Sequence, residues 1–420
     1  MLVTKASRTS EENMDQSALN AEVKRQMKIL EFRTTEITPR DEFEKMLKHS
    51  IENNKPLRVK CGIDPTGCDV HLGHLVPYRK MREFQDLGHT GVVIIGDYTA
   101  QIGDPTGKNE SRKKLGAEEV AENAKTYMDQ VFTVLDKDKT EVRYQSDWFE
   151  KTNLHQILEW AAQTTVAKLI SHDTFKKRID EGQSLGLHEL FYPVLQGIDS
   201  TMIDADVELG GSDQRFNVLM GRDYQKVQNV RPQVAMLLPI VTGLCGTQKM
   251  SKSLDNYIGV FDEPFDKFGK VMSIPDNLMP EYYQYMANLP VSEFESMNTQ
   301  LKNGSIHPNE AKKQLASKIV SLFHGDEQGA LMREQFERVF KKKKVPDEIE
   351  EFNLESGMNV LEVMVKAGMV SSNGEGRRML KQNAVSIVDG DKITDPAQGI
   401  DSSFKGSVLK VGKRRFLKLV

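Results

Sequence analysis

Two short apolar segments separated by a helical pattern constrain the fold of this chain most strongly. Residues 57–63 (LRVKCGI) and 92–95 are typical of buried strands, while residues 71–87 have helical spacing and end at Gly88. A helix that connects two neighbouring strands of one sheet makes those strands parallel. The sequence therefore predicts an α/β domain with an open parallel sheet, whose ligands bind at the carboxyl ends of the strands.

The same alternation continues along the chain and gives the domain organisation. We expect helices at 117–135, 154–178 and 213–227, a strand at 207–209, an apolar run at 234–240, and mainly helices from 262 to about 341. A lysine run followed by Val-Pro-Asp marks a linker. The predicted divisions are a polar, helix-prone N-terminal extension (1–30), a catalytic domain with a helical insertion (31–261), a helical domain (262–345), and a linker with a small domain from about 357 (346–420).

Composition excludes several classes of protein. Of the 420 residues, 38% are hydrophobic and 28% are charged, as in soluble globular chains. No apolar run approaches the roughly 18 residues of a membrane helix. The first residues mix Asp and Glu with Lys and fit neither a secretory signal nor a transit peptide, so we expect a cytoplasmic protein. Three cysteines are too few for a disulfide framework.

Charge is unevenly distributed. The whole chain carries a formal charge of −4, but residues 357–420 hold 11 basic and 6 acidic side chains, leaving −9 for the remainder. A basic module attached to an acidic body is typical of an appendage that binds a polyanion. On charge alone, a solvated charged surface is an equally good interpretation.

The predicted helix at 71–87 begins with His71-Leu72-Gly73-His74. Histidines three residues apart lie on one side of a helix, beside its N-terminal N–H groups and the positive end of its dipole, which favours an anion. Gly73 leaves room for a flat ring to pack against the backbone. Alone, this tetrapeptide is weak evidence, because surface or capping histidines produce the same pattern.

Zinc is a competing interpretation of this segment, since Cys61, Cys68, His71 and His74 are all competent ligands. Their spacing lacks the close cysteine pair of a structural zinc knuckle. Cys61 also lies within an apolar strand, where its side chain is expected in the core. We therefore expect no metal bound by the protein itself.

A second motif, Lys249-Met250-Ser251-Lys252-Ser253, follows a glycine-bearing loop far along the chain. Two lysines on such a loop can close over a polyphosphate as point charges, with serine hydroxyls as additional donors. A K-x-x-K pattern by itself is usually solvated surface. Together with HLGH on the first crossover helix it becomes specific.

HLGH and KMSKS together resemble the two signatures of class I aminoacyl-tRNA synthetases. The stretches VKCGIDPTGCDVHLGH, IGDYTAQIGDPTGK, LFYPVLQGIDS and DVELGGSDQRFN narrow the resemblance to the bacterial-type tyrosyl-tRNA synthetases. With the C-terminal module, it covers nearly everything from residue 57 onward. It implies a Rossmann-like catalytic domain, a helical domain and a small α+β RNA-binding domain.

The resemblance implies ATP contacts at the two signatures. It implies that His71, His74 and Thr66 contact the phosphates of ATP, and that Lys249 and Lys252 contact the departing pyrophosphate. The implied ATP-binding residues are Gly73, which would pack against adenine, Lys252, Gly210, Gly211 and Asp213.

The amino-acid pocket is expected around residues 188–200. Tyr192, Gln196 and Asp199 stand at i, i+4 and i+7 and so share one helix face. Such a polar stripe is most often exposed to solvent. The resemblance instead implies that Tyr192 and Gln196 bind the amino end of tyrosine, while Asp199 accepts a hydrogen bond from its phenol. The other implied substrate-binding residues are Asp104, as a partner of the ammonium group, Gln214, Asp64 and Lys60.

Local alternatives and departures remain at several of these positions. Asp104 precedes a proline and is equally a turn residue, and Gln214 could be a residue of a first helical turn. Many family members have Tyr at the position of Lys60, as a second partner of the phenol, and often Tyr at Ile198. We therefore expect phenol recognition to depend mainly on Asp199.

The C-terminal module resembles a small RNA-binding fold first described in a ribosomal protein. We expect Asn373 to cap a helix that presents basic side chains, with Gly376 where the family usually has Ala. A closing strand is expected to carry Lys413, Arg414 and Arg415. The predicted tRNA-binding residues are Arg377, Arg378, Lys381, Lys413 and Arg414.

The implied activity is that of a tyrosine-tRNA ligase. Tyrosine would attack the α-phosphate of ATP, and the resulting tyrosyl-adenylate would pass its tyrosyl group to the 3′ end of tRNA(Tyr). The implied partners are L-tyrosine, ATP with Mg²⁺, tRNA(Tyr) and a second copy of the chain in a homodimer, without a membrane. Alternatives are activation of another aromatic amino acid and a non-catalytic RNA-binding paralogue.

Overall fold

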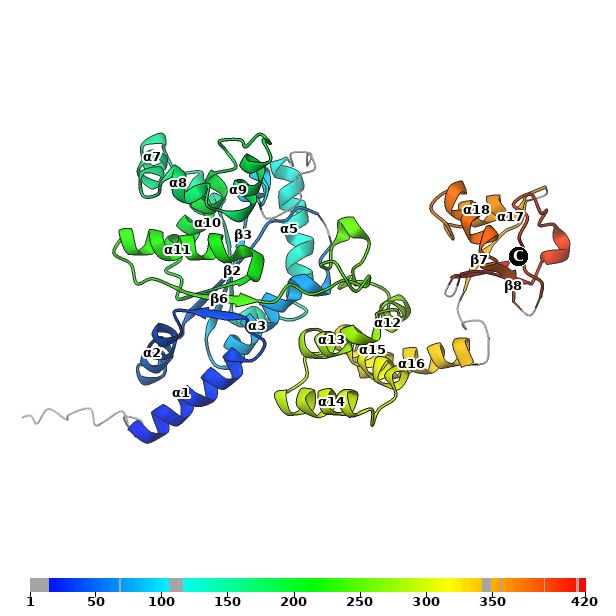
Figure 1. The fold of residues 1–420 in the computed structure, drawn as a ribbon, viewed down its shortest axis with the longest axis horizontal. Helices are drawn as coiled ribbons and strands as arrows, with labels where there is room; N and C mark the ends of the chain where they lie inside the picture. Colours follow the sequence, from blue (N-terminus) through cyan, green and yellow to red (C-terminus); the bar gives the residue numbers. More distant parts are fainter. Residues whose placement is uncertain are drawn as a thin grey trace, which may run out of the picture. The chain divides into compact units, whose positions relative to one another are not determined.

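The computed structural model describes residues 15–67, 69–105, 116–341, 349–355, 357–388, 390–412 and 415–420. Contacts divide the chain into two units. The first comprises Met1–Asp262 and Ile274–Ile306, and the second comprises Glu263–Ser273 and His307–Val420. Figure 1 shows the elements of both units in sequence colours.

A parallel sheet forms the centre of the first unit. Among the described residues its strand order is β1-β6-β5-β2-β3-β4, and only the edge pair β1/β6 is antiparallel. The predicted parallel pairing of the first two core strands is therefore confirmed. The strands are β1 (Glu36–Thr38), β2 (Arg58–Ile63), β3 (Thr90–Ile95), β4 (Thr140–Tyr144), β5 (Val207–Gly211) and β6 (Val234–Leu238).

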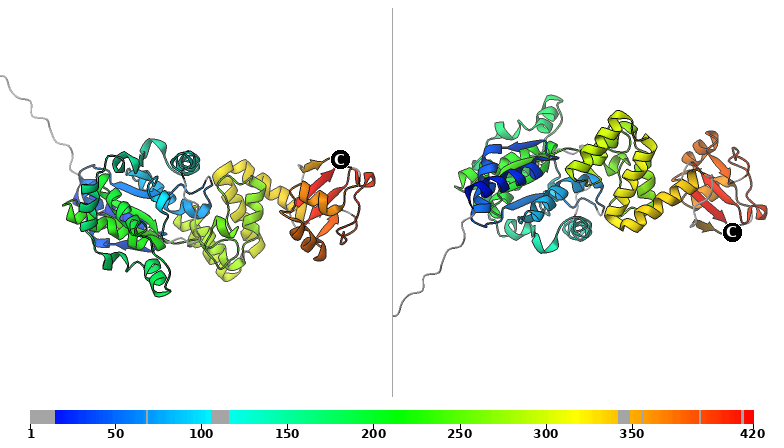
Figure 2. Two further views of the ribbon diagram at one scale, coloured as in Figure 1. Left: turned by 90° about the horizontal axis from the view of Figure 1, so that it is seen from above. Right: turned by 90° about the horizontal axis from the view of Figure 1, so that it is seen from below.

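Crossover helices cover both faces of this sheet. Helix α3 (Leu75–Asp86) connects β2 to β3, and α11 (Arg215–Val227) connects β5 to β6 in the opposite direction along the sheet. In Figure 1, α3 lies on one side of the strands and α11 on the other. In Figure 2, green helices lie in front of the sheet in the view from above, and dark blue helices lie in front of it in the view from below. The order thus reverses between β2 and β5, where α/β folds place their ligands.

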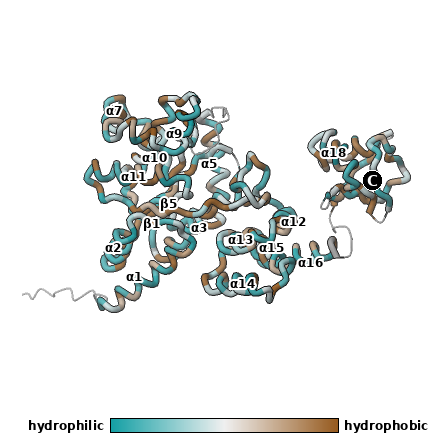
Figure 3. Tube along the Cα trace, viewed as in Figure 1, coloured by the Kyte–Doolittle hydropathy of each residue, from teal (hydrophilic) through white to brown (hydrophobic). Residues whose placement is uncertain are grey.

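The inner strands are largely apolar because both of their faces are covered, with Lys60 in β2 and Glu208 in β5 as buried charged exceptions. Every residue of β6 is buried, as are nearly all of β3 and β5. The hydropathy colouring in Figure 3 is brown along this part of the sheet. Continuous apolar strands of this kind were the strongest signal in the sequence.

The predicted helix at 154–178 is wrong as one element, because the structure has three. They are α7 (Leu154–Ala162), α8 (Val166–Leu169) and α9 (Asp173–Asp180). Each new helix begins with a side chain that accepts a backbone N–H: Asn153 from Gln156, Thr165 from Lys168, and His172 from Thr174. These caps interrupt the helical hydrogen bonding that the periodicity suggested.

The remaining elements of the first unit frame the sheet. The helix predicted at 117–135 ends earlier, as α5 (Ala117–Val131), while the helix carrying the polar stripe is α10 (Phe191–Met202). Short 3-10 helices precede α3 and α11. The others are α1 (Gln16–Glu31), α2 (Arg40–Glu52), α4 (Thr99–Ile102), α6 (Ser146–Phe149), α13 (Met279–Tyr285) and α14 (Val291–Asn303), with 3-10 helices at Leu72–His74, Lys137–Lys139, Ser212–Gln214, Lys252–Leu254 and Asp276–Leu278.

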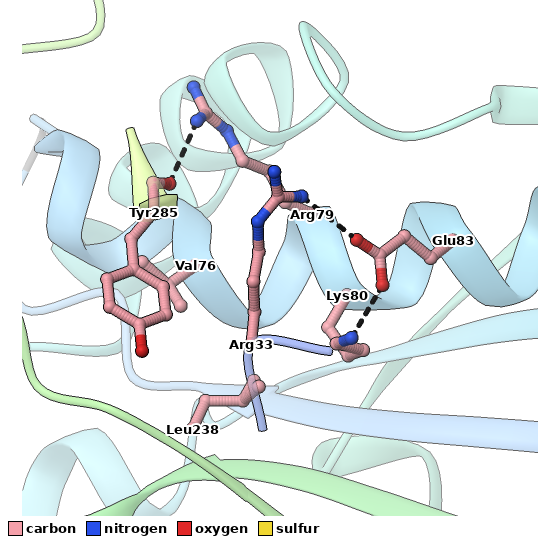
Figure 4. A pocket seen from close by; sticks show the side chains of 7 residues that line it. All are labelled: Arg33, Val76, Arg79, Lys80, Glu83, Leu238 and Tyr285. Carbon is pink, nitrogen blue, oxygen red and sulfur yellow. Dashed lines mark hydrogen bonds and ion pairs between the residues drawn. The ribbon is translucent and has the colours of Figure 1, made fainter. Parts of the chain in front are cut away.

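Cations from α3 hold the C-terminal ends of two helices. Lys80 Nζ donates to the carbonyl oxygens of Leu30, in the last turn of α1, and of Phe32, its C-cap, and Arg79 donates to that of Tyr285 at the end of α13. Positive groups at these C-terminal ends interact favourably with the negative end of the helix dipole. Figure 4 shows the small cavity at this junction, which is lined by Arg33, Val76, Arg79, Lys80, Glu83, Leu238 and Tyr285.

The second unit contains packed helices and a smaller sheet. Helices α12 (Pro264–Met272), α15 (Pro308–His324) and α16 (Asp326–Lys341) pack on one another, with the rings of Phe268 and Phe336 5.2 Å apart. Among the described residues from 349 onward, a four-stranded sheet has the order β7-β10-β9-β8. Its elements are β7 (Glu350–Phe352), α17 (Val360–Lys366), α18 (Asn373–Lys381), β8 (Val385–Ile387), a 3-10 helix (Ser402–Phe404), β9 (Val408–Val411) and β10 (Arg415–Leu419). None of the helices in the described ranges is long and apolar enough to cross a membrane.

Candidate active site

The sequence signatures meet where the strand order reverses. HLGH follows the carboxyl end of β2, and the segment Gly210-Gly211-Ser212-Asp213 spans the carboxyl end of β5. Polar groups from the two loops therefore share one edge of the sheet, as the sequence predicts.

The two histidines of HLGH stack instead of spreading apart. Their ring centroids are 3.5 Å apart with an interplanar angle of 19°. Burial, with the nearby charge of Lys252, lowers the pKa of His71 to about 3; burial also holds the pKa of His74 well below its usual value. Both rings are therefore neutral at pH 7 and can donate an N–H without carrying charge.

Hydrogen bonding defines how these rings can act. His74 Nδ1 accepts the backbone N–H of His71 at 3.4 Å, which leaves the proton of the neutral ring on Nε2. His71 Nδ1 is buried and makes no hydrogen bond within the described residues. A buried polar atom without a partner is costly and often marks the position of a ligand.

The KMSKS segment (residues 249–253) lies directly beside HLGH. Thr242 pairs with Lys249 in a β-bridge, and Met250 N donates to Val241 O at 2.8 Å. A Cβ added to Gly73 would lie at van der Waals distance, 3.6 Å, from the Cβ of Met250 and tightly, at 3.1 Å, against His71 Nδ1. The two signatures are thus neighbours, as the resemblance implies.

Asn256 fixes the conformation of the KMSKS segment. Its Oδ1 accepts the N–H of Ser251 at 2.8 Å, and its Nδ2 donates to Lys249 O at 3.0 Å. Farther along, Leu72 N donates to Ile258 O at 2.9 Å, which joins this region to HLGH. Backbone and side-chain bonds therefore hold the segment at both ends.

Both lysines of KMSKS contact residues at the carboxyl-terminal edge of the sheet. Lys249 Nζ lies 3.5 Å from Asp213 Oδ2, and Lys252 Nζ donates to Asp69 O at 2.8 Å. A Cβ at Gly67 would lie 3.1 Å from Lys252 Nζ. Thr66 is exposed in the same turn. Two ammonium groups thus border the histidine pair.

The polar face of α10 points into the protein. Tyr192 is buried and its hydroxyl donates to Asp64 Oδ2 at 3.0 Å, while Thr99 Oγ1 donates to Asp64 Oδ1 at 2.6 Å. A Cβ at Gly96 would come within 2.1 Å of Asp64 Oδ1, so the position directly after β3 favours glycine. The interpretation of this stripe as a solvent-facing surface is wrong.

Asp104 and Gln214 form a second polar pair near Tyr192. Gln214 Nε2 donates to Asp104 Oδ2 at 2.7 Å, while Asn217 Nδ2 donates to Gln214 Oε1 at 2.9 Å and so fixes the amide orientation. Burial, then the charges of Asp104 and Asp64, raise the pKa of Tyr192 well above its usual value. Negative charge therefore surrounds this hydroxyl, which suits an ammonium ligand.

Asp199 is buried at the far end of the same helix face. Its carboxylate accepts from Gln145 Nε2 at 2.7 Å and from Trp148 Nε1 at 3.2 Å. Gln145 Oε1 accepts Thr99 N at 3.0 Å, so the amide must present its nitrogen to Asp199. Burial raises the pKa of Asp199 to about 7, although Lys60 and the Gln145 hydrogen bond act in the opposite direction.

Gln196 and Lys60 complete this wall through Glu208 on β5. Gln196 Nε2 donates to Glu208 Oε1 at 3.1 Å, and Lys60 Nζ lies 2.9 Å from the same oxygen. Lys60 also donates to Gln196 O at 2.9 Å. The predicted substrate-binding residues of the first unit thus belong to three hydrogen-bonded sets. These sets interact electrostatically, since the charge of Asp104 acts on Tyr192 and that of Lys60 acts on Asp199.

The predicted basic helix in the C-terminal module is α18, and its cap differs from the prediction. Ser372, not Asn373, is the N-cap, because its hydroxyl accepts the N–H of Glu375 at 3.2 Å. A Cβ at Gly376 would lie 2.4 Å from Leu361 Cδ1, which favours glycine at this contact with α17. The basic side chains that α18 exposes are Arg377, Arg378 and Lys381.

The other basic positions are divided. Lys413 and Arg414 lie outside the described residues. Arg415 is ion-paired with Glu375 at 3.0 Å and also donates to Met369 O. A structural contact within the module therefore already engages Arg415.

The structure does not support a zinc site at two of the four candidate ligands. One has a thiol that resists deprotonation, and the other lies outside the described residues. Burial raises the pKa of the Cys61 thiol to about 12, whereas zinc binds the thiolate. Cys68 lies outside the described residues. Across the described ranges, no group of three or more His, Cys, Asp or Glu side chains could hold a metal ion.

Several residues of the site have no counterpart in the sequence prediction. Three of them follow strand ends: Thr99 comes after β3, and Gln145 and Trp148 come after β4. A search for polar residues at the carboxyl ends of strands could have found these three. Glu208 and Asn256 carried no sequence signal, since one is inside an apolar strand and the other in a loop. The residues missed are Thr99, Gln145, Trp148, Glu208 and Asn256.

Comparisons with known proteins agree with this geometry. Residues 52–341 match the family described as tRNA synthetases class I (W and Y). The chain is 44% identical over 402 residues to a tyrosine–tRNA ligase of Moorella thermoacetica, covering 96% of this chain and 97% of that protein. It is 46% identical over 398 residues to one of Desulfotalea psychrophila, with coverage of 94% and 98%. The chain belongs to the tyrosine–tRNA ligase family.

A solved structure supports the fold of this family member. The tyrosyl-tRNA synthetase of Archaeoglobus fulgidus, solved with L-tyrosine, superposes with a TM-score of 0.60 at 22% identity, covering 74% of this chain and 99% of that one. The Rossmann-like class I fold expected from the sequence is thereby confirmed. The family assignment does not favour a non-catalytic paralogue or a ligase for another aromatic amino acid.

Proposed function

We propose that the chain activates L-tyrosine with ATP and transfers the tyrosyl group to the 3′ end of tRNA(Tyr). The observation that carries this proposal is the contact between HLGH and KMSKS at the sheet reversal, next to the buried polar face of α10. One group of residues suits a triphosphate, and the other suits a small zwitterion with a polar ring.

The first step would be attack of the tyrosine carboxylate on the α-phosphate of ATP. The tyrosine oxygen forms a bond to phosphorus, the bond to the β-phosphate oxygen breaks, and pyrophosphate leaves. This step depends on positioning and on stabilising the developing charge. His71 and His74 would donate neutral N–H groups to the phosphates, together with Thr66, while Lys249 and Lys252 would neutralise pyrophosphate.

Adenosine would occupy the neighbouring glycine-rich surfaces. Gly73 would let adenine pack against the backbone next to Met250, since no side chain intervenes. Gly210 and Gly211 at the end of β5, with Asp213 on the following turn, would line the other side. Asp213 would exchange its present partner Lys249 for groups of the nucleotide when that lysine moves to pyrophosphate.

Tyrosine would lie along α10, with its ends read by different residues. The ammonium group would bind where Tyr192, Asp64 and Asp104 concentrate negative charge, with Gln196 and Gln214 as polar neighbours. The phenol would donate to Asp199. Phenylalanine would be rejected because it leaves the buried Asp199 carboxylate without this partner.

Transfer to tRNA would engage the basic module. The exposed side chains Arg377, Arg378 and Lys381 on α18 suit phosphate contacts, and we include Lys413 and Arg414 on sequence grounds. The proposed division of labour follows the predicted domains: 31–261 for chemistry, 262–345 as a helical connection and 346–420 for RNA. The N-terminal extension (1–30) has no assigned role.

We also propose that the chain acts as a homodimer in the cytoplasm, with Mg²⁺ carried in by ATP. Phosphate oxygens are the hard ligands that magnesium prefers, and the ion would offset phosphate charge. For the dimer, the support is the apolar surface of α7: no residue of this helix is buried, and Leu154 and Leu158 are 70% and 59% exposed one turn apart.

Exchange of labelled pyrophosphate into ATP, with each of the twenty amino acids in turn, tests the proposed activation. We expect exchange with tyrosine and little with any other amino acid. Lys302→Ala, a change on exposed α14, serves as a control that should leave exchange unaltered. Exchange driven by another amino acid, or none at all, would contradict the proposal.

A further inference from the structure

A buried ion pair crosses the sheet where the strand order reverses. Lys60 on β2 and Glu208 on β5 are register partners in the parallel pairing, and their side chains are 0% and 1% exposed. Nζ and Oε1 lie 2.9 Å apart. Buried charges are costly unless they are paired and fully hydrogen-bonded, so the groups around them matter.

Lys60 directs its ammonium group at three oxygen acceptors. These are Glu208 Oε1, Gln196 O at 2.9 Å and Ser200 Oγ at 2.7 Å. An ammonium group has three N–H donors, so this set uses all of them. Two of the acceptors belong to α10, one turn apart, and the ammonium therefore binds the helix to β2.

Glu208 collects donors from the same helix and from the residue preceding β6. Its carboxylate accepts from Gln196 Nε2 and from Ser200 Oγ, both at 3.1 Å, and from Gln233 Nε2. Gln233 Nε2 also donates to Val218 O at 3.1 Å. The carboxylate is thus held from several sides.

This arrangement fixes Gln196 twice. Lys60 holds its backbone carbonyl, and Glu208 holds its side-chain nitrogen. Because an ionised carboxylate can only accept hydrogen bonds, Glu208 forces the amide to turn its nitrogen inward. The amide oxygen is then the atom that Gln196 can offer to a ligand, which is what an ammonium group requires.

We propose that Lys60 and Glu208 are positioning residues that set the amide orientation of Gln196 for the amino end of tyrosine, and that Lys60 does not read the phenol. The inference rests on the proposed function and deepens it. It agrees with the expectation that phenol recognition depends mainly on Asp199, and it gives Lys60 a role other than that of the tyrosine found at this position in many family members.

A positioning role for Lys60 and a direct contact with the phenol predict different effects on the use of phenylalanine. The amino end is common to both amino acids, so a loss of Gln196 orientation should weaken tyrosine and phenylalanine equally. Removal of a phenol partner would weaken tyrosine alone. The ratio of their kcat/KM values therefore separates the roles.

The central variant is Glu208→Gln, which keeps the shape of the side chain but lets the Gln196 amide rotate. Pyrophosphate exchange should be measured at pH 8.5, where Asp199, with a pKa of about 7, is ionised in parent and variant. We expect KM for tyrosine to rise about 10-fold with kcat changed less, and the preference over phenylalanine to stay within about twofold. In a Gln196→Ala background, Glu208→Gln should add no further rise.

Two comparisons keep stability effects apart from positioning. Glu337→Gln breaks the partly buried ion pair with Lys313 (2.7 Å) and should lower the melting temperature without changing KM for tyrosine. If Glu208→Gln does not fold, the charge-free pair Lys60→Met with Glu208→Gln leaves no unpaired ion and should show the same KM effect.

The outcomes are distinct. A fall in tyrosine preference, an unchanged KM, or effects that add to those of Gln196→Ala would each overturn this inference while leaving the proposed function intact. A parent chain that shows no tyrosine-dependent exchange would instead overturn the proposed function, and this inference with it.

Discussion

Lys252 Nζ lies 2.8 Å from the carbonyl oxygen of Asp69, a residue 183 positions earlier in the chain. This hydrogen bond joins the KMSKS segment to the turn that leads into HLGH. The ammonium group is thus already beside the histidine pair, and a carbonyl is a partner it can exchange for phosphate oxygens at little cost. We infer that this contact is a resting position of the lysine.

Lys252→Ala should slow adenylation strongly. If the ammonium group stabilises departing pyrophosphate in the transition state, its loss should lower the rate about 100- to 1000-fold, as for the loss of one oxyanion donor, while tyrosine affinity stays nearly unchanged. Single-turnover adenylate formation and equilibrium binding of tyrosine measure the two effects. A near-normal rate would exclude this role, and Lys302→Ala provides the matched lysine control.

Selection of tyrosine should depend on pH through Asp199. Burial raises the pKa of this carboxyl to about 7, so below pH 7 it is increasingly protonated and a poorer acceptor for the phenol. The ratio of kcat/KM for tyrosine to that for phenylalanine should therefore rise with pH between about 6 and 8. Asp199→Asn should flatten this rise and reduce the ratio by about 10- to 100-fold, since hydrogen bonds to charged groups contribute about 1.5 to 3 kcal/mol.

The same protonation has a consequence for stability, with a defined sign. A carboxyl whose pKa is raised on folding binds more protons in the folded state between its unfolded value, about 3.9, and 7, so its contribution to stability falls as pH rises through that window. Asp199→Asn should remove this part of the pH dependence. Thermal unfolding of parent and variant between pH 5 and 8 measures the difference, and parallel profiles would argue against the raised pKa.

The parts of the site that could be predicted follow from motifs and from sheet topology. HLGH and KMSKS are recognisable in sequence, and parallel strands place their carboxyl-terminal loops at one edge. The proximity of His71, Lys252 and the α10 face was therefore predictable. The polar stripe containing Asp199 could be assigned to the amino-acid pocket only through the family resemblance, because periodicity alone favours a solvent-facing surface.

The rest depended on tertiary partners. Gln145 and Trp148 hold Asp199 from the segment after β4, and no local pattern connects that segment to α10. Glu208 lies in a strand that otherwise reads as apolar, and only the register with β2 shows that it faces Lys60. Likewise, the caps at Thr165 and His172 divide a segment whose hydrophobic spacing predicts a single helix.

The exposed face of α7 should be needed for dimer formation. Leu158→Asp places a charge on this apolar surface, which costs little in a monomer but much in a buried interface. Analytical ultracentrifugation should show a dimer for the parent and a monomer for the variant. Leu331→Asp on α16, where the leucine is 46% exposed, should remain dimeric. A monomeric parent, or a dimeric Leu158→Asp variant, would exclude α7 as the interface.

Neutralising α18 should weaken tRNA binding without affecting adenylation. Arg377→Gln or Arg378→Gln should lower the slope of log affinity against log salt by about 1 for each phosphate that the variant no longer neutralises. Lys366→Gln is the matched control in the same module, because its Nζ is already paired with Glu355 at 2.9 Å. If the arginine variants keep the parent's slope, α18 is only a solvated surface.

The most direct measurement of the central claim is to charge total bacterial tRNA with ATP and an equimolar mixture of all twenty amino acids, and to identify what is attached. The account predicts that tyrosine is found, on tRNA(Tyr) alone, and that Lys252→Ala lowers the initial rate of its attachment about 100- to 1000-fold at the same enzyme concentration. Attachment of a different amino acid, or tyrosyl-adenylate formation without any charged tRNA, would contradict it.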